Sequence, residues 1–154
     1  MGKELKLWVD GNELSKDGIK ERFDRYNNQY FGSVLGTCSF FWLNAEPGFN
    51  GKYAETCTKE GKVHSQIGIN RKIHWTEEGF RDLLVHEMIH MYVSTIDGKK
   101  HDGLLDHGRH FRAQCKRLKA EFGLDIKAHG GLSRTDKQLS LKLWEKIVLW
   151  IIDR

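Results

Sequence analysis

The sequence predicts an α+β domain, because helical and strand-like patterns follow one another along a chain whose composition suits a folded core. Of its 154 residues, 39% are hydrophobic and 30% are charged, and only one is proline. These proportions are typical of a globular protein with a buried core rather than of a disordered segment. The length gives no reason to divide the chain, so we expect a single domain over residues 1–154.

The N-terminal half predicts one helix followed by three strands. Within residues 15–31, apolar side chains recur at spacings of three and four, and Ser15 can cap the helix. An apolar and aromatic run over residues 38–43 predicts a strand. Residues 52–58 and 62–70 flank a short turn that ends in glycine, and the second of them alternates in polarity. These two segments therefore predict an antiparallel hairpin.

The C-terminal half predicts further helices. Thr76 can cap a helix that carries apolar residues on more than one face, so we expect it to be the most buried helix. It ends by residues 97–98, and a polar loop follows. Residues 108–122 then predict a helix with one apolar face. The apolar residues within 139–152 fit helical spacing, with a strand as the alternative.

Composition narrows the classes of function. The net charge of +4 is small and the basic residues are dispersed, which permits an acidic partner without indicating one. The isolated cysteines Cys38, Cys57 and Cys115 suggest buried free thiols rather than disulfides or a thiolate zinc site. The N-terminus has no apolar export-signal core, and the apolar stretch 141–152 is too short and too charged to span a bilayer. We therefore expect a cytoplasmic protein without a membrane segment.

The clearest functional signal is the pattern His86-Glu87-x-x-His90 within the predicted buried helix. The Cβ atoms of residues four apart on a helix lie about 5–6 Å from each other, so both imidazoles can bind one zinc ion. Glu87 follows the first histidine, where a carboxylate can accept a proton from zinc-activated water. In the alternative interpretation all three are ordinary core residues. That would bury three polar groups in the most apolar helix, which is costly without a metal.

A catalytic zinc ion takes a third protein ligand and leaves a fourth position for water. The candidates are His101, His107 and His110, with Glu121 as a carboxylate alternative. We favour His107, because it lies between the polar loop and the next helix, which can fix its position. His101 lies in the middle of the loop, and His110, one helical turn further on, is a candidate to support a metal ligand or to contact substrate. For both residues, an ordinary surface histidine is the more common interpretation.

Three segments stand out in the sequence. They are Tyr26-Asn27-Asn28-Gln29-Tyr30-Phe31-Gly32 followed by Leu35, then Leu83-Leu84-Val85-His86-Glu87-Met88-Ile89-His90, and then His107-Gly108-Arg109-His110-Phe111. Together these segments resemble the SprT-like, or Spartan-type, zinc metalloprotease family. The resemblance covers roughly residues 15–120, in the order expected for the family.

This resemblance implies that His86, His90 and His107 bind Zn²⁺ and that Glu87 is the catalytic acid and base. It also implies a compact zincin-like fold, with a small antiparallel sheet packed on the metal-binding helix. Members of the family carry a C-terminal zinc ribbon in many cases, but no paired cysteines follow Cys115, so we expect none here.

The resulting hypothesis is a zinc-dependent metallopeptidase that hydrolyses peptide bonds in a protein or peptide substrate. The resemblance suggests action on DNA-associated proteins, and we hypothesise weak, salt-sensitive DNA binding through phosphate contacts. The alternative function is a nucleic-acid-associated binding module with a structural zinc and no peptidase activity. A structural zinc prefers four protein ligands, often thiolates, whereas a catalytic one keeps an open position.

Overall fold

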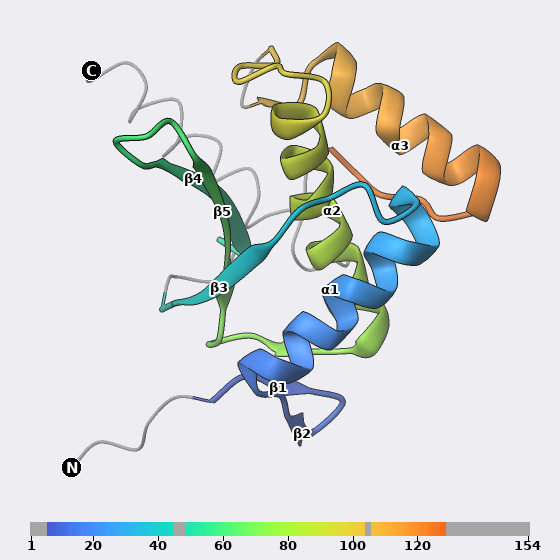
Figure 1. Cartoon of the computed structure of the whole chain (residues 1–154). Helices are drawn as coiled ribbons and strands as arrows, with labels where there is room; N and C mark the ends of the chain where they lie inside the picture. The colour runs from blue at the N-terminus through green and yellow to red at the C-terminus, as the bar shows by residue number, and fades with distance from the viewer. Residues whose placement is uncertain (1–5, 45–48, 104–105, 129–154) are drawn as a thin grey trace, which may run out of the picture.

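The computed structural model describes residues 6–44, 49–103 and 106–128. These residues form three helices and two three-stranded sheets, so the predicted α+β class is confirmed (Figure 1). The segment 139–152, for which a helix or a strand was predicted, lies outside the described residues. No helix within the described ranges is both long and apolar enough to cross a bilayer.

The helices begin and end close to where the sequence predicts. They are α1 (Lys16–Phe31), α2 (Glu77–Thr95) and α3 (Arg109–Phe122). The Ser15 hydroxyl accepts a hydrogen bond from the amide of Gly18 at 3.2 Å. Thr76 caps α2 in the same way, with the amide of Gly79 at 3.0 Å. Both predicted caps are therefore confirmed, and each satisfies one of the amides that a helix start leaves without an intrahelical partner.

The larger sheet is mixed rather than purely antiparallel. Its strands are β3 (Cys38–Leu43), β4 (Gly51–Cys57) and β5 (Val63–Asn70), in the order β3-β5-β4. Strands β4 and β5 form the predicted antiparallel hairpin. Strand β3 runs parallel to β5, with Phe40 opposite Ile67, so the expectation of an antiparallel sheet was wrong for this pair. The difference arises because β5 lies between β3 and β4, and β3 therefore pairs with the second strand of the hairpin.

A second, smaller sheet joins the N-terminal segment to the start of α2. Its strands are β1 (Trp8–Val9), β2 (Asn12–Glu13) and β6 (His74–Trp75), in the order β2-β1-β6. Strand β1 pairs in parallel with β6, and the amide of Asp10 donates to the carbonyl of Trp75 at 2.8 Å. Strands of two residues are too short to show an alternating pattern, so the sequence did not predict them.

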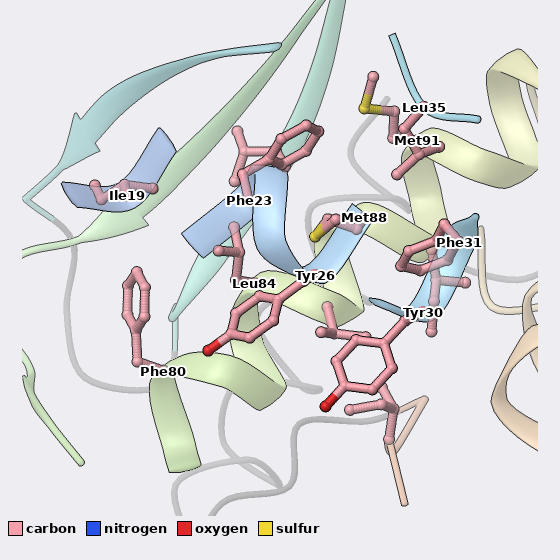
Figure 2. Close-up of a cluster of buried hydrophobic side chains, with 14 of the residues drawn as sticks. Ile19, Phe23, Tyr26, Tyr30, Phe31, Leu35, Phe80, Leu84, Met88 and Met91 are labelled. Atoms are coloured by element: carbon pink, nitrogen blue, oxygen red, sulfur yellow. The ribbon is translucent and has the colours of Figure 1, made fainter. Parts of the chain in front are cut away.

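Helix α2 forms the centre of the core. It packs against β4 and against α3, and its buried residues include Phe80, Leu84 and Met88, each 0% exposed. Figure 2 shows Phe23 and Tyr26 of α1 in the same cluster as Leu84 and Met88. Within the described residues, α2 is the most buried helix, as predicted from the apolar residues on several of its faces.

The end of α1 is closed by a buried asparagine. The Asn27 side-chain amide donates to the carbonyl of Leu35 at 3.0 Å, and its side-chain oxygen accepts from the Leu35 amide at 3.2 Å. The backbone carbonyl of Asn27 accepts from the amides of Gly32 and Ser33. The first of the three family-like segments therefore serves to fix the chain where it leaves α1.

The three cysteines are free thiols, but they are not uniformly buried. Cys38 and Cys115 are partly buried, whereas Cys57 is exposed. The expectation of buried thiols was wrong for Cys57, because this residue ends β4, which is an edge strand of the larger sheet.

Candidate metal centre

Three histidine side chains converge from two elements of the fold. His86 and His90 lie on consecutive turns of α2, and His107 directly precedes Gly108, the N-cap of α3. The Nε2 atom of His107 is 3.1 Å from Nε2 of His90 and 3.2 Å from Nε2 of His86. One ring nitrogen from each histidine lies within 4.8 Å of the others. Within the described ranges, this is the one group of three or more potential ligands that could hold a metal ion.

The spacing of these nitrogens fits a tetrahedral metal site. Nitrogens at about 2.0–2.1 Å from a zinc ion, in tetrahedral directions, are about 3.3–3.4 Å apart. The two measured separations, 3.1 and 3.2 Å, are close to that value. Three neutral imidazoles are also a donor set that zinc accepts readily, and they leave one coordination position open.

A backbone carbonyl orients the first histidine. Nδ1 of His86 lies 2.9 Å from the carbonyl oxygen of Lys127, in the segment that follows α3. A carbonyl only accepts, so Nδ1 carries the hydrogen and Nε2 keeps its lone pair on the side of the other two histidines. Such contacts to the second ring nitrogen typically fix the tautomer and orientation of a metal-binding histidine. The role of Lys127 is not predictable from the sequence, because a main-chain acceptor has no side-chain signature.

A buried phenylalanine contacts all three imidazoles. Phe111 of α3 is 0% exposed. Its ring centroid lies 4.9 Å from that of His86, 4.6 Å from His90 and 4.7 Å from His107. Packing at these distances restricts the rotation of each ring. The sequence placed Phe111 on the apolar face of α3 but did not assign it to the site.

The environment of His90 keeps its imidazole neutral. Burial, and then the charges that His86 and His107 would carry, lower the pKa of His90 to about 2. At physiological pH this ring is therefore unprotonated. An unprotonated imidazole retains the lone pair that a metal ion requires.

Glu87 is buried between α2 and strand β4. The residue is only 5% exposed. A Cβ atom placed on Gly51 of β4 would lie 3.2 Å from Oε1 of Glu87. Burial raises the pKa of Glu87 to about 8, partly opposed by a hydrogen bond from the backbone of Tyr53. A divalent cation held by the histidines on either side would favour the ionised carboxylate.

The other candidate ligands lie apart from this group. His101 is exposed. Nδ1 of His110 lies 3.5 Å from a carboxylate oxygen of Asp97, and Glu121 pairs with Arg117 at 3.2 Å. The structure thus brings together His86, His90 and His107, and it does not add His101, His110 or Glu121 to their group.

The family of the chain follows from a comparison with family models. A search among curated proteins found no match. A scan of family models matched the SprT-like family over residues 19–130, which include most of α1, the larger sheet, α2, α3 and all three histidines. The match covers well over half of the chain, and we conclude that the chain belongs to the SprT-like family.

Proposed function

We propose that this protein is a zinc-dependent metallopeptidase, with His86, His90 and His107 as metal ligands and Glu87 as general base and acid. The observation that carries the proposal is the position of Nε2 of His107, at a zinc-like spacing from Nε2 of both His86 and His90, with the buried carboxylate of Glu87 on the same helix as these two. Membership of the SprT-like family supports a metallopeptidase-like domain.

In this proposal the protein and the ion have separate tasks. When bound, zinc supplies a Lewis acid that lowers the pKa of a water molecule to about 7 and polarises the scissile carbonyl. The carboxylate of Glu87 accepts a proton from the attacking water and later delivers it to the leaving amine. His86, through its bond to the carbonyl of Lys127, and the ring of Phe111 hold the ligand geometry during this cycle.

The alternative function, a binding module with structural zinc, is less well supported. Such a zinc ion typically has four protein ligands, often thiolates. The candidate group in the described residues contains three histidines and no cysteine. Burial of a glutamate next to a metal ligand also lowers the stability of the fold, which favours a chemical role for this residue.

The test is the substitution Glu87→Gln. The amide has nearly the same shape but cannot accept a proton from water, so we expect zinc content and melting temperature to be preserved. Loss of a general base should reduce the hydrolysis of a fluorogenic casein substrate by about 10²-fold or more. The control is Glu78→Gln, which alters an exposed glutamate on the same helix and should leave hydrolysis unchanged. Equal activity of zinc-loaded Glu87→Gln and parent protein would remove Glu87 from the mechanism.

A further inference from the structure

Helix α3 begins without a capping side chain of its own. Its N-cap residue, Gly108, makes no side-chain hydrogen bond, and its first turn contains no acidic residue. The carboxylate of Asp102, six residues earlier, takes this place. Its Oδ1 accepts from the amide of His110 at 3.3 Å, and its Oδ2 accepts from the amide of Phe111 at 2.7 Å. A capping oxygen normally serves these second and third positions of a helix.

The backbone of Asp102 closes the same loop. Its carbonyl accepts from the amide of Gly108 at 2.7 Å, and its amide donates to a carboxylate oxygen of Asp106 at 3.1 Å. A Cβ atom on residue 108 would lie 2.7 Å from both the carbonyl carbon and the carbonyl oxygen of Asp102, so this approach requires glycine. Asp102 itself is 6% exposed. A buried carboxylate is therefore built into the turn that carries His107.

The turn that Asp102 closes positions two residues of the candidate metal centre, His107 and Phe111. His107 lies between Asp106 and Gly108, and the backbone of Asp102 forms a hydrogen bond with each of these two residues. Phe111, whose amide binds Oδ2 of Asp102, is the ring against which all three imidazoles pack. The position of Asp102 thus determines where the third histidine and its aromatic support stand relative to α2.

We propose that Asp102 is a positioning residue of the metal centre, which holds His107 and Phe111 in place and thereby sets the metal affinity. This inference rests on the zinc site proposed above. Replacement of Asp102 by alanine leaves the amides of His110 and Phe111 without this acceptor and allows the start of α3 to fray. The histidine at its entrance then loses its fixed direction, and outer contacts of this kind typically contribute 10–100-fold to metal affinity.

The experiment separates positioning from simple helix capping. Zinc dissociation constants are measured by competition with a chromophoric chelator for the parent, Asp102→Ala, Asp102→Asn and Ser15→Ala, and unfolding in urea is measured on the zinc-free forms. Ser15 caps α1 by one comparable hydrogen bond, away from the histidines, so Ser15→Ala is the matched control. We expect Asp102→Ala to weaken zinc binding about 10–100-fold. Asp102→Asn retains one acceptor oxygen, so its zinc affinity should lie between those of the parent and Asp102→Ala. Ser15→Ala should be less stable than the parent, with unchanged zinc affinity.

Gly108→Ala disturbs the contact between residue 108 and the carbonyl of Asp102 from the side of residue 108. It replaces Asp102→Ala in the experiment if that variant does not fold. It should also weaken zinc binding, and in both variants the visible absorption of bound Co²⁺ should shift as the ligand geometry changes. Parent-like zinc affinity in Asp102→Ala or Asp102→Asn, together with lower stability, would reduce Asp102 to a helix cap and overturn the inference. A parent protein that binds no zinc would instead overturn the metal site, and the inference with it.

Discussion

Glu87 depends on the absence of a side chain on the facing strand. A Cβ atom at Gly51 would lie 2.7 Å from Cδ1 of Leu83, 3.1 Å from the carbonyl of Gly68 and 3.2 Å from Oε1 of Glu87. Even a methyl group therefore requires the carboxylate or the leucine to move, because real Cβ contacts are seldom this short. The room for the proposed general base is thus set by a residue on another element.

We therefore expect Gly51→Ala to reduce kcat/KM by at least tenfold, while the melting temperature falls by only a few degrees. A carboxylate displaced by a fraction of an ångström is a poorer proton acceptor, and small misplacements at reacting groups are costly. The measurement is steady-state hydrolysis alongside thermal unfolding. Gly36→Ala is the control, because a Cβ atom there meets nothing within 4 Å and should change neither quantity. Parent-like activity in Gly51→Ala would show that this contact does not constrain Glu87.

At the scale of residues, the sequence predicted those members of the site whose relative positions follow from helical periodicity. His86, Glu87 and His90 could be identified because four residues span about one turn, so a sequence interval becomes a distance. His107 was one of several candidates, because the course of a loop is not contained in local spacing. Asp102 acts on amides eight and nine residues later through that loop, and no periodic pattern marks such a contact.

At the scale of elements, the helices and the hairpin were predictable, and the pairing of β3 was not. Helix caps and alternating polarity are local signals, and they placed α1, α2, α3 and the β4–β5 hairpin correctly. Whether a strand joins one side of a hairpin or the other depends on side-chain packing between distant segments. The strand order β3-β5-β4 is therefore a tertiary result, which a single run of residues does not encode.

A polar cluster connects strand β4 to the C-terminal end of α2. Oε1 of Glu55 accepts from the hydroxyl of Tyr53 at 2.6 Å and from the hydroxyl of Ser94, and Oε2 accepts from Nζ of Lys100 at 2.6 Å. Burial alone would raise the pKa of Glu55, but the hydrogen bonds from Lys100, Ser94 and Tyr53 outweigh it and lower the pKa. The carboxylate side chain is 19% exposed, so solvent screens the cluster only in part.

This lowered pKa makes the cluster a source of pH-dependent stability. The contribution is present above the unfolded pKa of 4.5 and is lost as the pH falls through the folded value, because protonation then favours the unfolded chain. We expect Glu55→Gln to lower the free energy of unfolding at pH 7 by about 1.5–3 kcal/mol, as for hydrogen bonds to a charged group. Urea unfolding of both proteins should show this difference shrinking below pH 4.5. The exposed Glu21→Gln is the control, and a difference that persists at low pH would contradict the assignment.

At the scale of the whole molecule, a metal ion would join elements that are separate in the chain. His86 and His90 come from α2, His107 from the turn before α3, and the carbonyl of Lys127 from the segment after α3. A ligand that binds only the folded state stabilises it by about 2.7 kcal/mol at a free concentration 100-fold above its Kd. Metal binding and folding should therefore be coupled.

We accordingly expect removal of the metal by a chelator to lower the melting temperature by several degrees, and addition of zinc to restore it. His107→Ala should show a much smaller response, because one ligand is missing. His101→Ala removes an exposed histidine outside the group and should respond as the parent does. Differential scanning calorimetry measures the melting temperatures of the parent and both variants with and without zinc. A zinc-dependent shift in His107→Ala as large as in the parent would contradict the ligand assignment.

The distribution of charge suggests where nucleic acid would bind. Helix α3 exposes basic residues at spacings of three and four, which place them on one face: Arg109, Arg112, Lys116 and Lys119. We propose that this face makes weak phosphate contacts with DNA. Affinity should then fall steeply as salt rises, and the double substitution Lys116→Ser/Lys119→Ser should reduce both the affinity and the salt dependence.

Fluorescence anisotropy with a labelled oligonucleotide, from low to physiological salt, measures this binding. The matched control is Lys59→Ser/Lys62→Ser, which removes the same charge from the exposed turn of the hairpin and should bind as the parent does. An equal loss in both variants would show that net charge rather than α3 is responsible. No binding by the parent at low salt would remove DNA as a partner.

The parallel pairing of β1 with β6 also has a consequence for the order in which the chain folds. Trp8 lies opposite His74, so this contact closes a loop of more than sixty residues, whereas the β4–β5 hairpin closes one of only a few. Loop closure becomes slower and entropically costlier with length, and contacts between distant residues slow folding. The hairpin and the helices should therefore form early, and the N-terminal strand should dock last. In pulse-labelling hydrogen exchange, the amide of Asp10 should gain protection after the amides of β5.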